Sequence, residues 1–335
     1  MATILSGIQP SGSALHLGNY IGAILNWKKI VSNLQPDDRC LFMIADLHTL
    51  TSKHNAGEMA ENIKNLLATY MACGIVPDDK INFFIQSHIS AHCELCWILS
   101  TITPIGLLER MTQFKDKSSK LGREEVNAGL LYYPVLMVAD ILLYQANYVP
   151  VGEDQTQHLE FTRDIVQKFN NVYKQDNIFV MPKAMIDKTS KRIMSLGDGT
   201  KKMSKSTGED KDRIFLTDSN DQIAKKIKSA KTDSIKGIFS SPDRPEVSNL
   251  INIFSAINGK AVEDISNEYS TKDTKTFKED LTEVVINEIS PIREKIAKYS
   301  NEMEYIAKIV AKGNEKANAI ANLTLSKVKK AVGIL

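Results

Sequence analysis

Several features of common protein classes are missing from this 335-residue sequence. No run of eighteen apolar residues occurs, which argues against a membrane-spanning helix. The N-terminal apolar run, Thr3–Leu5, is too short for a signal peptide. We therefore expect no membrane association and a cytoplasmic location, or an organellar one after loss of a leader. Neither G-x-x-x-x-G-K-S/T nor G-x-G-x-x-G occurs, which excludes two frequent nucleotide-binding fingerprints.

A strong net charge is also missing. The formal net charge is +2, so no overall field favours nucleic acid, and any such site must be local. A local excess lies between residues 191 and 240, where twelve lysines and arginines accompany seven acidic residues. An ordinary solvated surface would explain the same composition.

Cysteine is scarce, which bears on metal and redox chemistry. The four cysteines lie in apolar surroundings: Cys40, Cys73, Cys93 and Cys96. The last two form a C-x-x-C pair, but the residues after it continue a helical pattern and no second pair follows. We expect buried, reduced thiols, and no metal held by protein side chains.

The first half of the chain alternates apolar runs with helical patterns. Continuous apolar runs predict buried strands at Thr3–Leu5, Cys40–Ala45, Ile81–Ile85 and Tyr148–Val151. Helical spacing follows them at Tyr20–Val31, at Glu58–Cys73, at Gly129–Gln145 with an interruption near Pro134, and in a segment ending at Phe169. This alternation predicts an α/β fold with a doubly wound parallel sheet.

Polar residues follow each of these strands. Ligands of doubly wound sheets bind at the carboxyl ends of the strands. The sequence therefore predicts one crevice, lined by Gln9, Asp46, His48, Gln86 and Gly152–Gln155.

From about Ser219 onward the strand signals vanish. Helical patterns take their place at Asp221–Lys231, Glu246–Ile257, Phe277–Tyr299 and Asn314–Val332. We expect an all-α second part.

The stretch Ser6–Gly22 is typical of a phosphate-binding turn. Its glycines allow sharp turns and a close approach of a nucleotide to the backbone, at Gly7, Gly12 and Gly18. The helix behind them presents free N–H groups to phosphate. His16 and Asn19 stand three residues apart, on one face of the first turn. By itself such a turn is weak support, and a lone histidine there is more often a polar helix start.

A second element, K-K-M-S-K-S at Lys201–Ser206, carries two lysines among hydroxyls, Lys202 and Lys205. Ammonium groups on a pliable loop can neutralise a departing phosphate. A bare K-x-x-K is far more often a solvated loop, so its weight depends on the glycine-rich element.

Together the two elements resemble the signatures of class I aminoacyl-tRNA synthetases. H-L-G-N at His16–Asn19 is similar to H-I-G-H, and K-M-S-K-S is the matching second element. With A-D-L-H-T-L-T, L-L-E-R-M-T-Q-F-K, Y-P-V-L-M-V-A-D-I-L-L-Y, V-P-V-G-E-D-Q and R-I-M-S-L, the chain resembles bacterial and organellar tryptophanyl-tRNA synthetases from residue 7 to 206. Asn19 replaces the last histidine of the signature, as is common in that branch.

The resemblance implies ATP bound with Mg²⁺ as a cofactor, L-tryptophan and tRNA(Trp) as partners, and a homodimer. It places these residues at ATP: Gln9, Pro10, Ser11, His16, Gly18, Asn19, Gly152, Glu153, Asp154, Ile193, Lys202, Met203, Ser204, Lys205 and Ser206. It gives catalysis by charge neutralisation to Lys115, Lys202 and Lys205. Plainer explanations stay open, because Glu153 and Asp154 would also suit a helix dipole and a lone Lys115 is usually solvated.

Asp140 lies inside an apolar helical stretch, where a carboxylate needs a partner. A buried salt bridge or cap would serve as well as a ligand. By resemblance, Asp140 accepts the indole N–H of tryptophan and Met137 packs on the ring. The resemblance also places Tyr133 and Gln155 at the polar end of the substrate. Helix packing would explain Tyr133 equally well, and a polar helix start would explain Gln155. The complete set expected at tryptophan is Asp140, Met137, Tyr133, Gln155, His48 as a pocket wall, and Gly7.

The resemblance also implies a division of the chain. We expect a Rossmann-like catalytic domain over residues 1–200, the second signature with a helical anticodon-binding domain over 201–300, and a C-terminal helix over 301–335 that packs back on the first domain. A purely structural all-α domain remains open for the helical part.

The expected reaction is attack of the tryptophan carboxylate on the α-phosphorus of ATP, release of pyrophosphate, and transfer of tryptophan to tRNA. Three alternatives remain: a tyrosyl-tRNA synthetase, another nucleotidyl transferase, and a non-catalytic paralogue that binds RNA. The G-E-D-Q and G-I-Q-P-S-G blocks argue against the first, and the long helical part against the second. The complete phosphate elements argue against the third.

Overall fold

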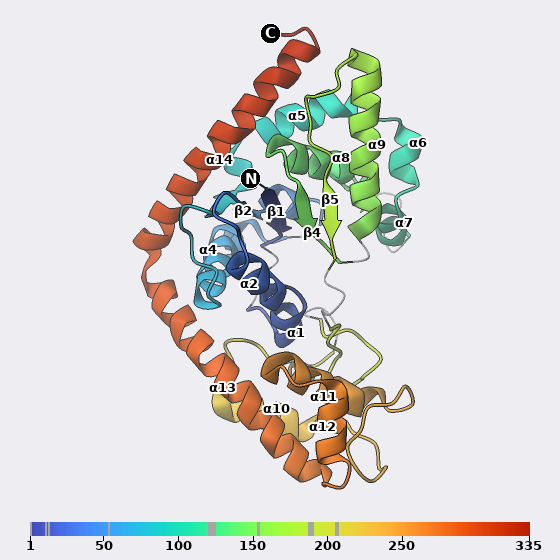
Figure 1. Cartoon of the computed structure of the whole chain (residues 1–335), viewed down its shortest axis with the longest axis vertical. Coiled ribbons are helices and arrows are strands. Elements are labelled where there is room, and N and C mark those ends of the chain that lie inside the picture. Colours follow the sequence, from blue (N-terminus) through green and yellow to red (C-terminus); the bar gives the residue numbers. More distant parts are fainter. Residues whose placement is uncertain are drawn as a thin grey trace.

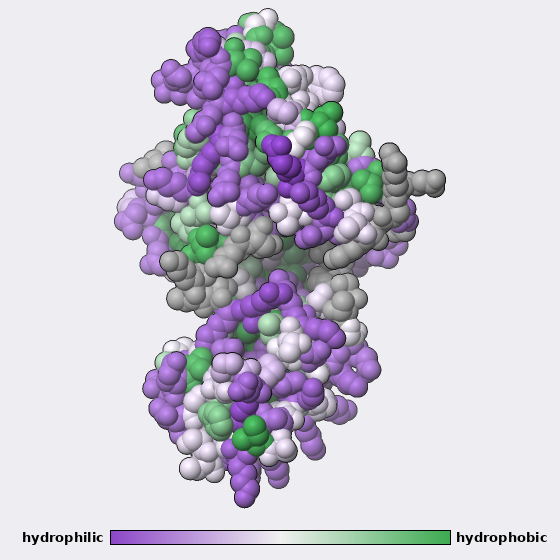
Figure 2. All heavy atoms as spheres, turned by 90° about the vertical axis from the view of Figure 1, so that its right-hand side faces the viewer, coloured by the Kyte–Doolittle hydropathy of each residue, from purple (hydrophilic) through white to green (hydrophobic). Residues whose placement is uncertain are grey.

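The computed structural model describes residues 2–10, 12, 14–52, 54–119, 125–152, 155–186, 191–204 and 208–335. In these residues the chain forms an α/β part, at the top of Figure 1, and a helical part below it. Figure 2 shows mostly hydrophilic residues on the face it presents, with a narrowing between the two parts.

A parallel sheet forms the centre of the α/β part. Its described strands, in spatial order, are β3 (Ile81–Ile85), β2 (Arg39–Ile44), β1 (Thr3–Ile8), β4 (Tyr148–Pro150) and β5 (Lys183–Met185). All four pairings are parallel, which confirms the predicted doubly wound α/β fold. Strand β5 was not predicted, because it is a three-residue edge strand without an apolar run.

The strands bury side chains on both faces, in two separate cores. Ile4 and Phe42 belong to the core shared with the helical part, whereas their neighbours Leu5 and Leu41 belong to the other. This division follows from the alternation of side chains along a strand. The helices of this part are α1 (Leu17–Asn19), α2 (Leu25–Ser32), α3 (Asp46–Thr49), α4 (Met59–Ala72), α5 (Ala91–Ser100), α6 (Ile105–Glu109), α7 (Thr112–Ser118), α8 (Ala128–Leu143) and α9 (Thr156–Tyr173).

Two expectations about this part are wrong. Helix α8 is not interrupted at Pro134 but runs through it. Proline removes one backbone hydrogen bond, and the packing of α8 against α5, α9 and α14 (Met303–Ala331) holds the helix together despite that loss. The cysteines are not all buried either, since Cys93 is exposed on α5. Cys40 and Cys73 are buried, which raises the pKa of both thiols to about 12.

The helical part contains α10 (Asn220–Ser229), α11 (Pro245–Asn258), α12 (Val262–Tyr269) and α13 (Thr274–Asn301). Helix α12 was not predicted. Helix α13 packs on α4, α10 and α11, and α14 continues along the molecule to pack on β3, α5 and α8 (Figure 1). Within the described residues, no helix combines the length and the apolar character that crossing a membrane requires.

Candidate active site

The glycine-rich turn pairs with the backbone that follows the second signature. The N–H of Leu17 donates to the carbonyl of Ile214 (2.7 Å), and the N–H of Leu216 donates to the carbonyl of Leu15 (2.9 Å). His16 and Phe215 therefore face each other in an antiparallel bridge. Two segments about two hundred positions apart in the sequence thus lie side by side.

His16 begins helix α1 and shares a capping box with Asn19. Its Nδ1 accepts the backbone N–H of Asn19 (3.2 Å), and the Asn19 side-chain oxygen accepts the backbone N–H of His16 (3.2 Å). Because Nδ1 accepts, a neutral ring carries its proton on Nε2, which is then a donor. The chain continues as a π-helical turn, Tyr20–Ile24, before α2.

The segments before and within the second signature form a short antiparallel pair. Met203 donates to Ile193 (3.0 Å), and Ser195 donates to Lys201 (2.8 Å). Ile193 and Met203 are buried, whereas Lys202, the residue before Met203, is exposed. We name residues 15–17, 193–195, 201–203 and 214–216 the paired segments.

Two residues beside the paired segments, Gly18 and Asn249, explain how closely these segments pack. A Cβ on Gly18 would lie 3.0 Å from His16 Nδ1 and 3.3 Å from Met203 Cβ, so this position has little room for a side chain. The buried Asn249 of α11 accepts from the N–H of Met194 (2.8 Å) and donates to its carbonyl (2.9 Å). Helix α11 thereby fixes the backbone beside Ile193.

The guanidinium of Arg213 donates to one backbone carbonyl within the second signature and to one just after it. It donates to Ser204 (2.7 Å) and to Gly208 (3.2 Å).

Five of the predicted ATP residues lie outside the described part of the chain: Ser11, Glu153, Asp154, Lys205 and Ser206.

One face of α8 carries three of the residues predicted at tryptophan. Tyr133, Met137 and Asp140 are spaced by four and three positions, so they share that face. Asp140 and Tyr133 are buried and Met137 is partly buried. His48 of α3 meets the same face, with its ring edge-on to Tyr133 at 6.3 Å between centroids.

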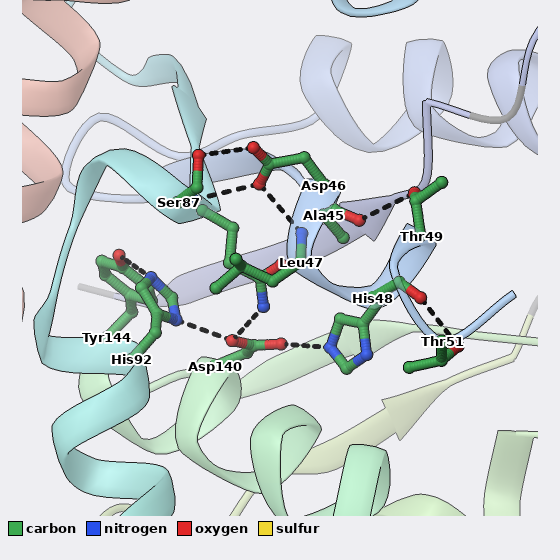
Figure 3. A network of polar contacts seen from close by, with 11 residues as sticks. Ala45, Asp46, Leu47, His48, Thr49, Thr51, Ser87, His92, Asp140 and Tyr144 are labelled. Atoms are coloured by element: carbon green, nitrogen blue, oxygen red, sulfur yellow. Dashed lines mark hydrogen bonds and ion pairs between the residues drawn. The ribbon is translucent and has the colours of Figure 1, made fainter. Parts of the chain in front are cut away.

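The carboxylate of Asp140 lies at the centre of a buried polar network (Figure 3). Its Oδ1 accepts from Gln86 Nε2 (2.7 Å) and His92 Nδ1 (2.6 Å), and its Oδ2 accepts from His48 Nε2 (2.8 Å). The other ring nitrogen of His92 meets the hydroxyl of Tyr144 (2.8 Å). We name these five residues the Asp140 cluster.

The cluster keeps its carboxylate ionised. Burial by itself would raise the pKa of Asp140, but hydrogen bonds from His48 and His92 outweigh it and lower the pKa to about 2. Gln86 Oε1 is buried, and no described residue donates to it. Such an acceptor marks room for a donor on a ligand or a water molecule.

A second acid, Asp46, connects the turns that follow β2 and β3. The backbone N–H of Ser87 donates to Asp46 Oδ1 (3.0 Å), and the Ser87 hydroxyl donates to Asp46 Oδ2 (Figure 3). Asp46 thus connects α3, which carries His48, with the 3₁₀ turn Gln86–His88. Two donors of the Asp140 cluster are therefore held in fixed relation to each other.

Tyr133 lies between a histidine and a lysine. Its hydroxyl is 2.9 Å from Nε2 of the buried His158, and burial raises the pKa of Tyr133 to about 12. The ammonium of Lys117 lies over its ring, 5.3 Å from the centroid, and partial burial lowers the pKa of this lysine. Lys115 is exposed on the same helix, α7.

The other predicted residues lie at the ends of β1 and β4. Gly7 is in β1, opposite Met43 of β2, with exposed Gln9 and buried Pro10 after the strand. The exposed Gly152 follows β4 and accepts the backbone N–H of Gln155, which precedes α9. These strands are neighbours at the point where the strand order reverses, the usual place of a ligand crevice.

The described part of the chain contains no cluster of side chains that could bind a metal ion. No group of three histidine, cysteine or acidic side chains there is placed to hold an ion.

Sequence reasoning missed several residues of these sites. His92 lies next to a C-x-x-C pair in an apolar segment, where it looks like an ordinary core residue. Asn249 contacts a segment that is distant along the chain, and Arg213 contacts backbone carbonyl groups. No local sequence pattern indicates either contact. Gln86 was placed at the crevice because it follows a strand, but its bond to Asp140 was not foreseen.

Known proteins share this architecture along the whole chain. A family profile described as tRNA synthetases class I (W and Y) matches residues 1–290. The tryptophan–tRNA ligase of Nostoc sp. is 49% identical over 333 residues, which cover 98% of this chain and 97% of the relative.

Two crystal structures extend the comparison to three dimensions. Tryptophanyl-tRNA synthetase from Mycoplasma pneumoniae is 35% identical with a TM-score of 0.84, over 99% of this chain and 98% of that one. The Campylobacter jejuni enzyme, complexed with ADP and tryptophan, is 34% identical with a TM-score of 0.82, over 99% of both chains. The chain belongs to the class I tRNA synthetases of the tryptophan and tyrosine family, and within them to the tryptophanyl-tRNA synthetases.

Proposed function

We propose that the protein activates L-tryptophan with ATP, releasing pyrophosphate, and transfers tryptophan from the adenylate to the 3′ end of tRNA(Trp). The observation that carries this proposal is the buried, ionised Asp140 at the end of the α8 face. An indole nitrogen is a hydrogen-bond donor only, so an apolar slot that ends in a carboxylate suits it. Met137 and Tyr133 on the same face would contact the ring and the polar end of the amino acid.

The paired segments form the proposed ATP site. His16, with Nε2 as a donor, and the exposed Lys202 both belong to them, and phosphate oxygens require such partners. The proposal extends to the rest of the expected set, including the residues outside the described part. Support comes from the relative of 34% identity that was solved with ADP and tryptophan.

The chemistry needs little from the protein beyond positioning and charge. The substrate carboxylate is itself the nucleophile, so no serine, cysteine or aspartate of the chain has to attack. Lys115, Lys202 and Lys205 would stabilise the negative charge that develops on the leaving pyrophosphate. When it arrives with ATP, Mg²⁺ would shield the phosphate oxygens, with phosphate and water as its ligands.

The helical part is the proposed tRNA-binding region. It exposes Lys225, Lys228 and Lys236, and lysines near a phosphate backbone contribute most of the affinity for nucleic acid. The proposed division is a catalytic domain over 1–200, an anticodon-binding domain over 201–300, and a C-terminal helix over 301–335. A homodimer and a cytoplasmic location complete the proposal and rest on family resemblance alone.

Amino-acid-dependent ATP–pyrophosphate exchange, run across the standard amino acids with Mg²⁺ and without tRNA, tests the proposal. Exchange with tryptophan alone is expected. Exchange with tyrosine would overturn the assignment of Asp140 to an indole. If no amino acid supports exchange, the protein is a binding module and not a ligase.

A further inference from the structure

His92 connects the Asp140 cluster to the core. It lies in the first turn of α5 and is completely buried, with its ring 6.2 Å from that of Phe84 and nearly parallel to it. Both ring nitrogens have partners, Asp140 Oδ1 on one side and the Tyr144 hydroxyl on the other. The histidine therefore bridges a carboxylate and a phenol that α8 and its C-terminal end supply.

The positions of the protons follow from this arrangement. Burial, together with the charge of Asp140, raises the pKa of Tyr144 well above its usual value, so the phenol keeps its proton. Tyr144 can then donate to Nε2 of a neutral His92, which leaves the ring proton on Nδ1. That N–H donates to Asp140.

The donors around Asp140 can be counted against its acceptor positions. A carboxylate offers about four lone-pair positions, two on each oxygen. Gln86 and His92 occupy Oδ1, and His48 occupies one position on Oδ2. With the described residues in place, one position therefore remains for a ligand, on Oδ2 beside His48.

We propose that His92 is a positioning and specificity-determining residue, which fixes Oδ1 and so leaves the Asp140 carboxylate one acceptor position, on Oδ2, for a ring with a single N–H donor. This inference rests on the proposed function and adds to it the reason why Asp140 discriminates. A ring of the same shape without a donor would leave the last position unpaired in a buried site, which is costly.

The experiment uses two substrates and four proteins. The substrates are tryptophan and β-(3-benzothienyl)alanine, in which sulfur replaces the indole N–H. The proteins are the wild type, His92→Leu, His92→Asn and the double variant His92→Leu/Tyr144→Phe. Asparagine places an N–H donor near the position of Nδ1, and the double variant avoids a buried phenol without a partner.

The readout is the ratio of kcat/KM in pyrophosphate exchange for the two substrates. We expect the wild type to prefer tryptophan strongly. Both variants with leucine should lose about tenfold or more of this preference, mainly through a higher KM for tryptophan, because a hydrogen bond to the carboxylate is lost. His92→Asn should restore most of it. If His92 only filled space in the core, its replacement would change kcat/KM for both substrates by the same factor, and their ratio would stay the same.

Tryptophan affinity as a function of pH gives a second readout. The hydrogen bond from His92 helps to lower the pKa of Asp140, so its loss lets burial raise that pKa. Affinity in His92→Leu should therefore fall as the pH is lowered, over a range where the wild type changes less. The titratable groups that face Asp140 and are common to both proteins are His48 of α3, Cys93 and Cys96 of α5, and Tyr144.

The outcomes separate this inference from the proposed function. A wild type that does not exchange with tryptophan refutes both. A wild type that does, combined with an unchanged preference and pH profile in the folded leucine variants, refutes the role of His92 alone. If the single leucine variant is unstable, an Asn variant that loses the preference as fully as the double variant also contradicts it.

Discussion

The Asp140 cluster and the paired segments use different means to hold their groups. In the cluster, buried side chains from α3, α5 and α8 bond to one another, and every member is nearly closed to solvent. In the paired segments, backbone hydrogen bonds set the geometry and the side chain of Lys202 is exposed. The first region is therefore fixed by contacts between buried side chains, whereas the second is a backbone frame with two exposed lysines, Lys201 and Lys202.

This difference suits the two proposed ligands. An indole offers a single directional donor, which a fixed carboxylate can recognise. A triphosphate changes its charge distribution during the reaction, and mobile ammonium groups can follow that charge. Substitutions in the two regions should therefore fail in different ways.

The largest effect is expected for Asp140→Asn. The amide has nearly the same shape but removes the charge and turns a donor toward groups that already donate. We expect kcat/KM for tryptophan in pyrophosphate exchange to fall by about 1,000-fold or more. Affinity for ATP should be nearly unchanged in equilibrium binding. A loss of less than tenfold would contradict the central role of this carboxylate.

Lys202→Ala should have the next largest effect, on rate and not on amino-acid binding. We expect the adenylation rate to fall about 100-fold, because a charge that stabilises the transition state is lost, while the dissociation constant for tryptophan stays the same. The same split is expected for Lys205→Ala. Lys201→Ala is the matched control, since that exposed ammonium pairs with Asp198 (3.0 Å). Equal losses in rate and affinity would contradict a transition-state role.

Gly18→Ala should have a moderate effect on the nucleotide alone. The added methyl group would press on the His16 ring and on Met203 and move the paired segments apart. We expect KM for ATP to rise on the order of tenfold, with KM for tryptophan unchanged. Gly22→Ala, where an added Cβ meets nothing within 4 Å, is the control. The packing argument is wrong if both variants behave like the wild type.

Asn314→Ala should have the smallest effect, on stability. The Asn314 side chain of α14 accepts the backbone N–H of Ile85 (2.9 Å), just before the turn that carries Gln86, and contacts His88 (2.8 Å), the last residue of that turn. We expect the free energy of unfolding to fall by about 1 kcal/mol, measured by denaturant titration. A small rise in KM for tryptophan without a change for ATP would show that this turn supports only the Asp140 cluster.

Much of the fold could be predicted because buried parallel strands leave a strong signal. The runs at Cys40–Ala45 and Ile81–Ile85 agree with β2 and β3 to within a residue. Strand β5 escaped prediction because one backbone pairing at a sheet edge needs no apolar residues. The continuity of α8 could not be predicted, since it depends on neighbours that compensate for Pro134.

The candidate site was predictable where function depends on short motifs, and less so where it depends on contacts. The two signatures and Asp140 stand out in the sequence, the last because a charge in an apolar helix needs a partner. Which partners satisfy that charge is a property of the assembled fold. Gln86 and His92 come from 54 and 48 positions away, and their residue types fit many other roles.

The contact between α14 and β3 has a consequence for how the chain is made. β3 is an edge strand, and the groups that cover it come from Gly313 and Asn314, the latter 229 positions after Ile85. During synthesis, the outer edge of β3 therefore stays open until Gly313 and Asn314 of α14 have left the ribosome. An open strand edge can pair with other chains, so the nascent protein is exposed to aggregation until α14 covers β3.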